Sequence, residues 1–283
     1  MRREAALQRI ERLELLNTLG KKATLAFSNV VRPGRVKDLL SGTWMGHPAH
    51  PMLTDVPIGA WVSAVVLDVV GHERSQPTAD ALIALGTLTA MPTAITGLND
   101  LADIVVPEDR AIGTAHAIGN VTAVVLFGAS YLTRLRGWRD VGATLALAGT
   151  AALTASGFLG GHLAYRRGVG VAQTAFQPRL ENWTPVLDKE ELPAGKPVRV
   201  SVGGTDVLLY RKAESIFAIA NRCTHRGGPL HKGKVGDGHV TCPWHLSIFA
   251  LEDGSVVRGP ATAPEPSYEV RTRDGKVEIR TRS

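Results

Sequence analysis

The chain has 283 residues, of which 44% are hydrophobic but only 5% aromatic, and its mean hydropathy is +0.03. This length predicts about two domains, and the average hydropathy combines an apolar part with a polar one, which excludes a single small module. The formal net charge of +6 comes without a basic stripe containing aromatic residues and without a nucleic-acid-reading motif, so we expect no nucleic-acid partner. Two cysteines exclude a disulfide framework.

Residues 1–50 form a basic segment with nine lysine or arginine residues and four acidic ones. The first twenty residues are too charged to contain the apolar core of a cleaved signal peptide, so we expect no export by that route. Within 5–19, Leu7, Ile10 and Leu13 recur at helical spacing and predict an amphipathic helix. We expect this helix to lie against the membrane or against the second domain.

Four apolar segments within 51–168 are long enough to cross a bilayer, which needs roughly 20 residues. They cover about 52–71, 80–98, 111–133 and 141–162. The first is the least apolar, because Asp55 and Asp68 lie near its ends. Many small residues in the segments favour close helix–helix packing, and the short connections favour antiparallel neighbours. The sequence therefore predicts a membrane-embedded, all-α bundle of four helices.

The distribution of basic residues predicts how the bundle is oriented in the lipid bilayer. With four spans, the N-terminal segment and everything after the fourth span share one side of the membrane. That side carries the nine N-terminal basic residues together with Arg110, Arg166 and Arg167, whereas the opposite loops carry four arginines. The positive-inside rule then predicts a multi-pass protein of the cytoplasmic membrane with its C-terminal domain on the cytoplasmic side.

Three histidines lie at the same end of the predicted spans. His50 precedes the first span, His116 is about one turn inside the third, and His162 ends the fourth. Imidazoles that face each other within a bundle are what bis-histidine haem ligation requires, so a b-type haem or a quinone site is one interpretation. The alternative is that these histidines cap helix ends at the membrane interface.

Two sequence segments around these histidines resemble a known family. They are His47-Pro48-Ala49-His50-Pro51 before the first span and Gly161-His162-Leu163-Ala164-Tyr165-Arg166-Arg167-Gly168 after the fourth. Over about 44–172 the chain resembles a family of bacterial four-helix membrane domains of unassigned function. The resemblance implies a membrane domain and brings no activity with it.

Residues 176–283 have a different sequence pattern, in which short stretches of alternating apolar and polar residues are separated by turn-forming residues. Asp237-Gly238, Asp253-Gly254 and Asp274-Gly275 each separate stretches rich in β-formers, and Gly203-Gly204 follows another. This pattern predicts an all-β domain, a small antiparallel sandwich or barrel.

The two cysteines of the chain each stand beside a histidine in this domain. Cys223-Thr224-His225 is followed, after sixteen residues, by Cys242-Pro243-Trp244-His245. Two thiolates and two imidazoles satisfy zinc, and they also satisfy a [2Fe–2S] cluster in which two histidines replace two cysteines at one iron. The residue types alone do not distinguish a zinc site from a [2Fe–2S] cluster.

The order of the motifs resembles the Rieske family over about 178–281. Besides both ligand pairs, Gly227-Gly228-Pro229-Leu230 follows the first pair and Arg258-Gly259-Pro260-Ala261 follows the second. The resemblance implies one Rieske-type [2Fe–2S] cluster. It implies that Cys223 and Cys242 bind the buried iron and that His225 and His245 bind the outer one.

Three neighbouring positions bear on the properties that the resemblance implies. Ser247 matches a hydroxyl that donates a hydrogen bond to the cluster. Phe249 stands where respiratory Rieske proteins have a tyrosine hydroxyl, which predicts a potential in the lower part of the range of about −150 to +300 mV. Leu246 occupies a place where the family usually has glycine.

Together these features predict a membrane-anchored protein that carries one electron on a Rieske-type cluster and makes no bonds itself. The expected partners are the lipid bilayer and a redox protein, which is a reductase, an oxygenase or a cytochrome. One alternative is an electron-transfer component of a multi-subunit Rieske oxygenase. No histidine follows His245 to build the second iron site of a stand-alone oxygenase. The other alternative is a metal-binding redox sensor, with zinc in place of iron.

Overall fold

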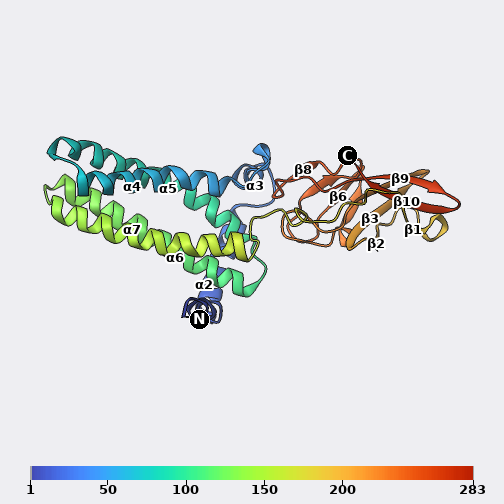
Figure 1. Ribbon diagram of the computed structural model, residues 1–283, viewed down its shortest axis with the longest axis horizontal. Helices are drawn as coiled ribbons and strands as arrows, with labels where there is room; N and C mark the ends of the chain where they lie inside the picture. The colour runs from blue at the N-terminus through green and yellow to red at the C-terminus, as the bar shows by residue number, and fades with distance from the viewer. Residues whose placement is uncertain (1, 283) are drawn as a thin grey trace. The chain divides into compact units, whose positions relative to one another are not determined.

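The computed structural model describes residues 2–282, which form two compact units (Figure 1). The helical unit comprises Met1–Val31 and Ala49–Val169, and the β unit comprises Arg32–Pro48 and Gly170–Ser283. The chain thus passes between the units three times, and the β unit contains residues that precede the four long helices in the sequence as well as residues that follow them.

The helical unit contains four long apolar helices, as the sequence predicted. Their bounds, with those of the shorter helices of this unit, are α1 (Arg2–Glu11), α2 (Glu14–Val30), α4 (Ala49–Val70), η2 (Glu73–Ser75), α5 (Gln76–Ala102), α6 (Pro107–Leu135), α7 (Arg139–Gly161) and the π-helical η3 (His162–Arg166). The four candidate spans have 22 to 30 residues and mean hydropathies of 1.4 to 1.6. At a rise of about 1.5 Å per residue, even the 22-residue α4 reaches across a hydrocarbon core of about 30 Å.

Glycines allow these helices to pack closely. A Cβ atom at Gly86 would lie 2.6 Å from the ring of Trp61, and one at Gly149 would lie 3.0 Å from the ring of Phe127. Those two rings stack on each other with centroids 4.3 Å apart. The small residues of the sequence therefore make room for aromatic rings between helices, which is how membrane helices gain packing contact.

A buried ion network joins four helices at the end of the bundle where α4 ends and α5 begins. Arg134 of α6 donates hydrogen bonds to both carboxylate oxygens of Asp68 and to Asp80 Oδ1 at 3.2 Å. Arg139 of α7 also contacts Asp80, at 2.9 Å. The Arg134 side chain is only 1% exposed, so its charge is held by these carboxylates and not by water.

The N-terminal helices pack against the bundle of their own unit. Arg110 of α6 donates a hydrogen bond to Asn17 Oδ1 of α2 at 3.1 Å. A Cβ atom at Gly20 would lie 2.2 Å from Thr114 Oγ1, so α2 approaches α6 closely at this glycine. The stretch predicted as one amphipathic helix, 5–19, is divided between α1 and α2, and both helices pack against α6 of their own unit.

The β unit consists of short antiparallel strands, as predicted for residues 176–283. Their bounds are β1 (Thr184–Asp188), β2 (Val198–Val202), β3 (Thr205–Lys212), β4 (Ser215–Ala220), β5 (Lys234–Gly236), β6 (His239–Thr241), β7 (Ile248–Ala250), β8 (Val256–Arg258), β9 (Tyr268–Arg273) and β10 (Lys276–Thr281). Three sheets have the orders β1-β10-β9, β2-β3-β4 and β5-β6-β7-β8. Asp237-Gly238 and Asp274-Gly275 turn in the left-handed backbone region, as tight hairpins require.

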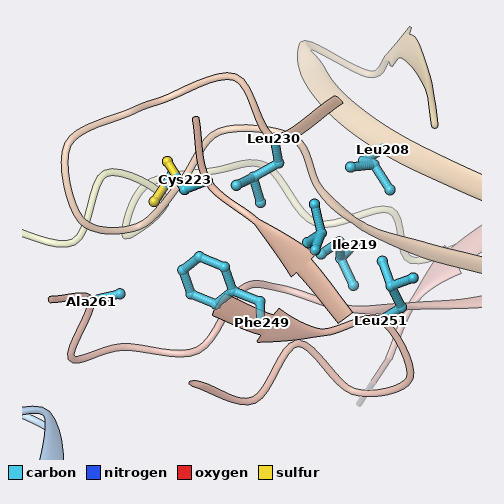
Figure 2. Close-up of a cluster of buried hydrophobic side chains, with 9 residues drawn as sticks. Leu208, Ile219, Cys223, Leu230, Phe249, Leu251 and Ala261 are labelled. Carbon is cyan, nitrogen blue, oxygen red and sulfur yellow. The ribbon is translucent and has the colours of Figure 1, made fainter. Parts of the chain in front are cut away.

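Two buried clusters stabilise the β unit. One joins Leu209, Ala218, Val277 and Ile279 between the first two sheets. The other surrounds the two cysteines with large apolar side chains that include Leu230 and Phe249 (Figure 2). The metal-ligand motifs therefore begin from a packed core and not from a free surface loop.

The segment before the first span also belongs to the β unit. It contains α3 (Arg35–Ser41) and η1 (Thr43–Met45), and Figure 1 shows α3 beside β8. This segment is separated in sequence from the rest of the β unit by the whole four-helix bundle.

Candidate metal centre

The two cysteine–histidine pairs lie in two loops of the β unit that are closed by their own backbone. In the first loop, after β4, Gly227 N donates to Cys223 O at 2.7 Å, and Cys223 N donates to Gly228 O at 2.9 Å. In the second loop, between β6 and β7, Cys242 N donates to Ser247 O at 2.8 Å. These bonds hold each pair at the turn of a tight loop.

The fold brings the four predicted ligands together. Cys223 and Cys242 are each 1% exposed, and a hydrogen bond links their side chains. The rings of His225 and His245 are half-buried, with centroids 5.0 Å apart and planes at 89°. The sulfur atoms therefore lie inside the unit and the imidazoles nearer its surface.

The protonation of the four groups suits metal binding. The hydrogen bond from Cys223 lowers the pKa of Cys242 to about 7 and raises the pKa of Cys223, because the pair shares one proton. Burial, with the positive charge of Arg226, lowers the pKa of His225 well below its usual range. One thiol is thus easily ionised, and the imidazole is neutral at neutral pH, which is the form that binds metal.

Two glycines shape the space between the loops. Gly227 has φ +77°, a conformation that favours glycine. At Gly228 a Cβ atom would lie 2.8 Å from Cys242 Sγ and 3.2 Å from the ring of Trp244. A side chain at Gly228 would push one loop away from the other, and a side chain at Gly227 would strain the left-handed backbone, so both positions favour glycine.

The neighbouring positions singled out in the sequence have distinct surroundings. Ser247 is fully buried and its Oγ accepts a hydrogen bond from Ala261 N at 3.0 Å. Phe249 is also fully buried and packs in the cluster that contains Cys223 (Figure 2). Leu246 adopts φ +64°, which accounts for the glycine that the resemblance leads one to expect there.

Glu265 is a buried carboxyl group that sequence reasoning missed. It is 2% exposed, and its Oε1 accepts a hydrogen bond from Thr224 N, between two predicted ligands, at 2.7 Å. Its Oε2 is buried and has no hydrogen-bond partner in the described part of the chain. Burial raises the pKa of Glu265 well above its usual range, so the group is protonated over a wider span of pH than an exposed glutamate.

The α3–η1 segment contacts the loop that follows β8. Gly259 N donates to Asp38 Oδ1 at 3.1 Å, and Thr43 Oγ1 donates to Ala261 O at 3.1 Å. Asp38 also pairs with Arg258 at 3.4 Å. No local sequence pattern predicts these contacts, because more than 200 residues separate the partners in the chain.

The donor set fits a two-iron cluster better than a single metal ion. Between residues 2 and 282, no three histidine, cysteine, aspartate or glutamate side chains gather where one metal ion would bind. A mononuclear zinc site needs three or four such ligands around one point, whereas each iron of a Rieske cluster takes only two protein ligands. Two sulfurs inside and two imidazoles outside match the latter requirement.

The three histidines of the helical unit that the sequence analysis named do not form one group. His50 and His116 meet edge to face with ring centroids 6.4 Å apart, and their Nδ1 atoms bond to the backbone oxygens of Thr93 and Ser156 at 2.9 and 2.8 Å. His116 Nε2 contacts Asn120 Nδ2 at 3.0 Å. These histidine rings therefore serve as hydrogen-bonded contacts between helices.

His162 lies apart from that pair, at the start of η3. It lines a cavity of about 520 Å³ together with Glu4, Leu7 and Phe158 among others. Its Nε2 atom is buried without a hydrogen-bond partner among residues 2–282. The structure thus brings together two of the three membrane histidines named from the sequence and places the third in a separate site.

Comparison with known proteins tests the resemblance independently. The model of the Rieske [2Fe-2S] domain matches residues 182–269. The ferredoxin subunit of anthranilate 1,2-dioxygenase from Burkholderia cepacia is 30% identical over 100 residues, which cover 35% of this chain and 93% of that protein. The chain belongs to the Rieske [2Fe-2S] family.

Two further proteins similar to this Rieske protein are also ferredoxins. The ferredoxin subunit of 3-phenylpropionate/cinnamic acid dioxygenase from Photorhabdus laumondii is 34% identical over 95 residues, covering 33% of this chain and 90% of the relative. A solved ferredoxin of carbazole 1,9a-dioxygenase from Nocardioides aromaticivorans is 24% identical, with 36% of this chain and all of that chain covered and a TM-score of 0.35. The curated relatives point to a Rieske-type electron carrier, and the family supports a [2Fe–2S] cluster.

A second family model matches another part of this Rieske protein. That model is described as a predicted membrane protein (DUF2231) and covers residues 46–173, which include all four candidate spans. The combination confirms the predicted order of a membrane domain followed by a Rieske domain. The comparisons give no support for haem or quinone in the bundle.

Proposed function

We propose that this protein is a membrane-anchored electron carrier whose Rieske-type [2Fe–2S] cluster is bound by Cys223, Cys242, His225 and His245. The observation that carries the proposal is that two separate loops bring these four side chains together, with buried sulfurs and half-buried imidazoles. The four apolar helices and the membrane-domain match support the anchor.

Each residue of the site has a task in this function. The bound cluster would accept and give up one electron at a time. The two cysteines hold the inner end within an apolar cluster that excludes water, and the two imidazoles provide the outer end, where a partner can approach. Gly228 keeps the loops close enough for all four ligands to converge.

A ligand substitution with a matched control tests the proposal. Cys223→Ser in the full chain, purified in detergent, is expected to abolish the visible bleaching on dithionite reduction. His239→Ala, which changes a histidine of the same unit outside the site, is expected to retain that bleaching. A cluster spectrum that survives Cys223→Ser, or a wild-type protein that binds zinc and shows no change on reduction, would contradict the proposal.

The partner proposed from the relatives is a redox protein of an oxygenase system. The two curated relatives are named as ferredoxin subunits of dioxygenases, so an oxygenase or its reductase is the partner that their names support. Purification from membranes under mild conditions is expected to recover an oxygenase or reductase chain with this protein. Recovery of the protein without such a chain, combined with rapid reoxidation by washed membranes alone, would point to a membrane acceptor instead.

The Rieske domain is proposed to face the cytoplasm, because basic residues accumulate on the side of the membrane that carries it. The two native cysteines are buried, so a single engineered surface cysteine can report sidedness. Lys276→Cys is expected to react with an impermeant thiol reagent in inside-out vesicles and not in right-side-out vesicles. Arg136→Cys, in the opposite loop, is expected to show the reverse, and the opposite result for both would place the domain outside.

A further inference from the structure

Glu265 is a buried carboxyl group to which the proposed function gives no task. It is 2% exposed, and its Oε1 accepts a hydrogen bond from Thr224 N at 2.7 Å. Its Oε2 is buried and has no hydrogen-bond partner among residues 2–282. Burying a polar atom without a hydrogen bond is costly, so packing alone does not account for a carboxyl group at this position. The bond to Thr224 is where its role is to be sought.

The backbone around Glu265 is fixed to the rest of the β unit. Pro264 and Pro266 flank this residue and restrict the backbone angles of the segment. Glu265 N donates to Gly254 O at 2.8 Å, and a Cβ atom at Gly254 would lie 2.0 Å from Glu265 O. Gly254 lies in the turn between β7 and β8, and β7 directly follows the second ligand loop. The carboxyl group therefore projects from a segment that is tied to the hairpin beginning at that loop.

Thr224 lies between two of the proposed ligands. Cys223, on one side of it, is proposed for the inner iron, and His225, on the other side, for the outer iron. Thr224 itself is 2% exposed. A rotation of the Thr224 backbone would therefore displace a ligand of each iron at once.

Three segments that are distant in the sequence hold Thr224 in place. Besides the bond to Glu265, Thr224 Oγ1 donates to Ala263 O at 2.8 Å, and Thr224 O accepts a hydrogen bond from Gln173 N at 2.9 Å. Of these three bonds, only the one to Glu265 uses a side-chain atom of the partner. Both cysteines of the chain are proposed ligands, so no disulfide bond can brace the ligand loops in its place.

We propose that Glu265 is a positioning residue of the Rieske site, whose carboxyl oxygen fixes the Thr224 backbone and thereby the relative placement of Cys223 and His225. The proposal rests on the proposed function, because it concerns ligands of the same cluster. The carboxyl group connects the first ligand loop to the hairpin that begins at the second. Its Oε1 atom is the group that matters, so a side chain that keeps an acceptor oxygen there can replace glutamate, whereas an apolar side chain cannot.

The test compares two substitutions of Glu265 in the full-length protein, purified in detergent. Glu265→Gln keeps an acceptor oxygen, whereas Glu265→Leu leaves the buried Thr224 amide without this acceptor. The rate of cluster loss in the presence of a chelator is expected to rise about tenfold in Glu265→Leu, which corresponds to about 1.4 kcal/mol. The electron paramagnetic resonance signal of its reduced cluster is expected to broaden and shift, because the ligands are no longer held in one arrangement. Glu265→Gln is expected to match the wild type in both measurements.

Ile279→Ala controls for a general loss of stability. Ile279 is fully buried in the cluster between the first two sheets, away from the ligand loops. This variant is expected to unfold at a lower denaturant concentration and to keep the wild-type resonance signal. A broadened signal in Ile279→Ala equal to that of Glu265→Leu would show that any destabilisation produces it, and the proposal would fail.

An unchanged signal and an unchanged rate of cluster loss in Glu265→Leu would also overturn the positioning role. If Glu265→Leu bound no cluster at all, Glu265→Gln would decide. A wild-type signal in Glu265→Gln would show that the acceptor oxygen is what the loop needs, whereas failure of both variants would overturn the proposal.

The two levels of inference fail in different ways. If the wild-type protein gave no cluster signal at all, the proposed function would be overturned. If the wild-type signal were present and Glu265→Leu shared it, only the inference about Glu265 would be lost.

Discussion

Replacing Ser247 with alanine separates two effects of one buried hydroxyl group. The Ser247 Oγ atom accepts a hydrogen bond from Ala261 N at 3.0 Å, and both residues are fully buried. Without the hydroxyl, the Ala261 N–H is left unsatisfied, which costs about 1–3 kcal/mol of folding free energy. Because Ala261 is the donor in that bond, the Ser247 hydroxyl keeps its own proton, which we propose it donates to the cluster.

The second effect of Ser247→Ala concerns the potential. A hydrogen bond to the cluster is stronger in the reduced, more negative state, so its loss lowers the potential. A net hydrogen bond of about 1 kcal/mol corresponds to about 40 mV for one electron, from the relation of 59 mV per tenfold change. The expected result is thus a less stable domain with a lower potential.

Two assays on the same preparation read these effects. Denaturant unfolding followed by the cluster absorbance gives the stability, and a mediator titration gives the potential. Ser215→Ala, the same change at an exposed position on β4, is expected to alter neither. A normal potential with reduced stability would refute the bond to the cluster, and a normal stability would refute the described loop geometry.

Three further predictions concern other parts of the molecule. Phe249→Tyr adds a hydroxyl donor within the cluster pocket and is expected to raise the midpoint potential; an unchanged potential in a mediator titration would contradict this. Burial raises the pKa of Glu265 in the folded state, so the wild type is expected to lose folding stability as the pH rises from about 4.3 through that raised pKa. Glu265→Gln cannot ionise and is expected to lack this loss. The same dependence of stability on pH in both proteins across pH 4–8 would contradict the prediction. Arg134→Ala leaves Asp68 without its buried cation and is expected to destabilise the bundle by about 3–5 kcal/mol in unfolding measurements in detergent. Arg139→Ala removes a more exposed arginine and is expected to cost much less. Equal losses of stability in the two variants would contradict the argument from burial.

The elements that could be predicted from the sequence are those whose signals are local. Long apolar runs predicted the four long helices, and the Asp-Gly pairs predicted hairpins that the structure places at the ends of β5 and β9. The spacing of Cys223, His225, Cys242 and His245 predicted a metal site because two short loops bring these residue types into reach of each other. Each of these inferences needed fewer than about 30 consecutive residues.

The features that were missed depend on contacts between distant segments. Asp38 and Thr43 lie in a stretch that reads as part of a basic N-terminal segment, and nothing in it indicates a contact with residues 259–261. The burial of Glu265 likewise follows from the packing of a loop against Thr224 and has no pattern in the sequence. The unusual Leu246 was visible in the sequence, but its explanation required the backbone angle of +64°.

The most direct test of the central claim is a combined metal, sulfide and paramagnetic resonance analysis of the full-length protein purified from membranes in detergent. We expect two irons and two acid-labile sulfides per chain, with a Rieske-type signal that appears on reduction and is absent from Cys223→Ser. One zinc per chain, no labile sulfide and no signal on reduction would contradict it.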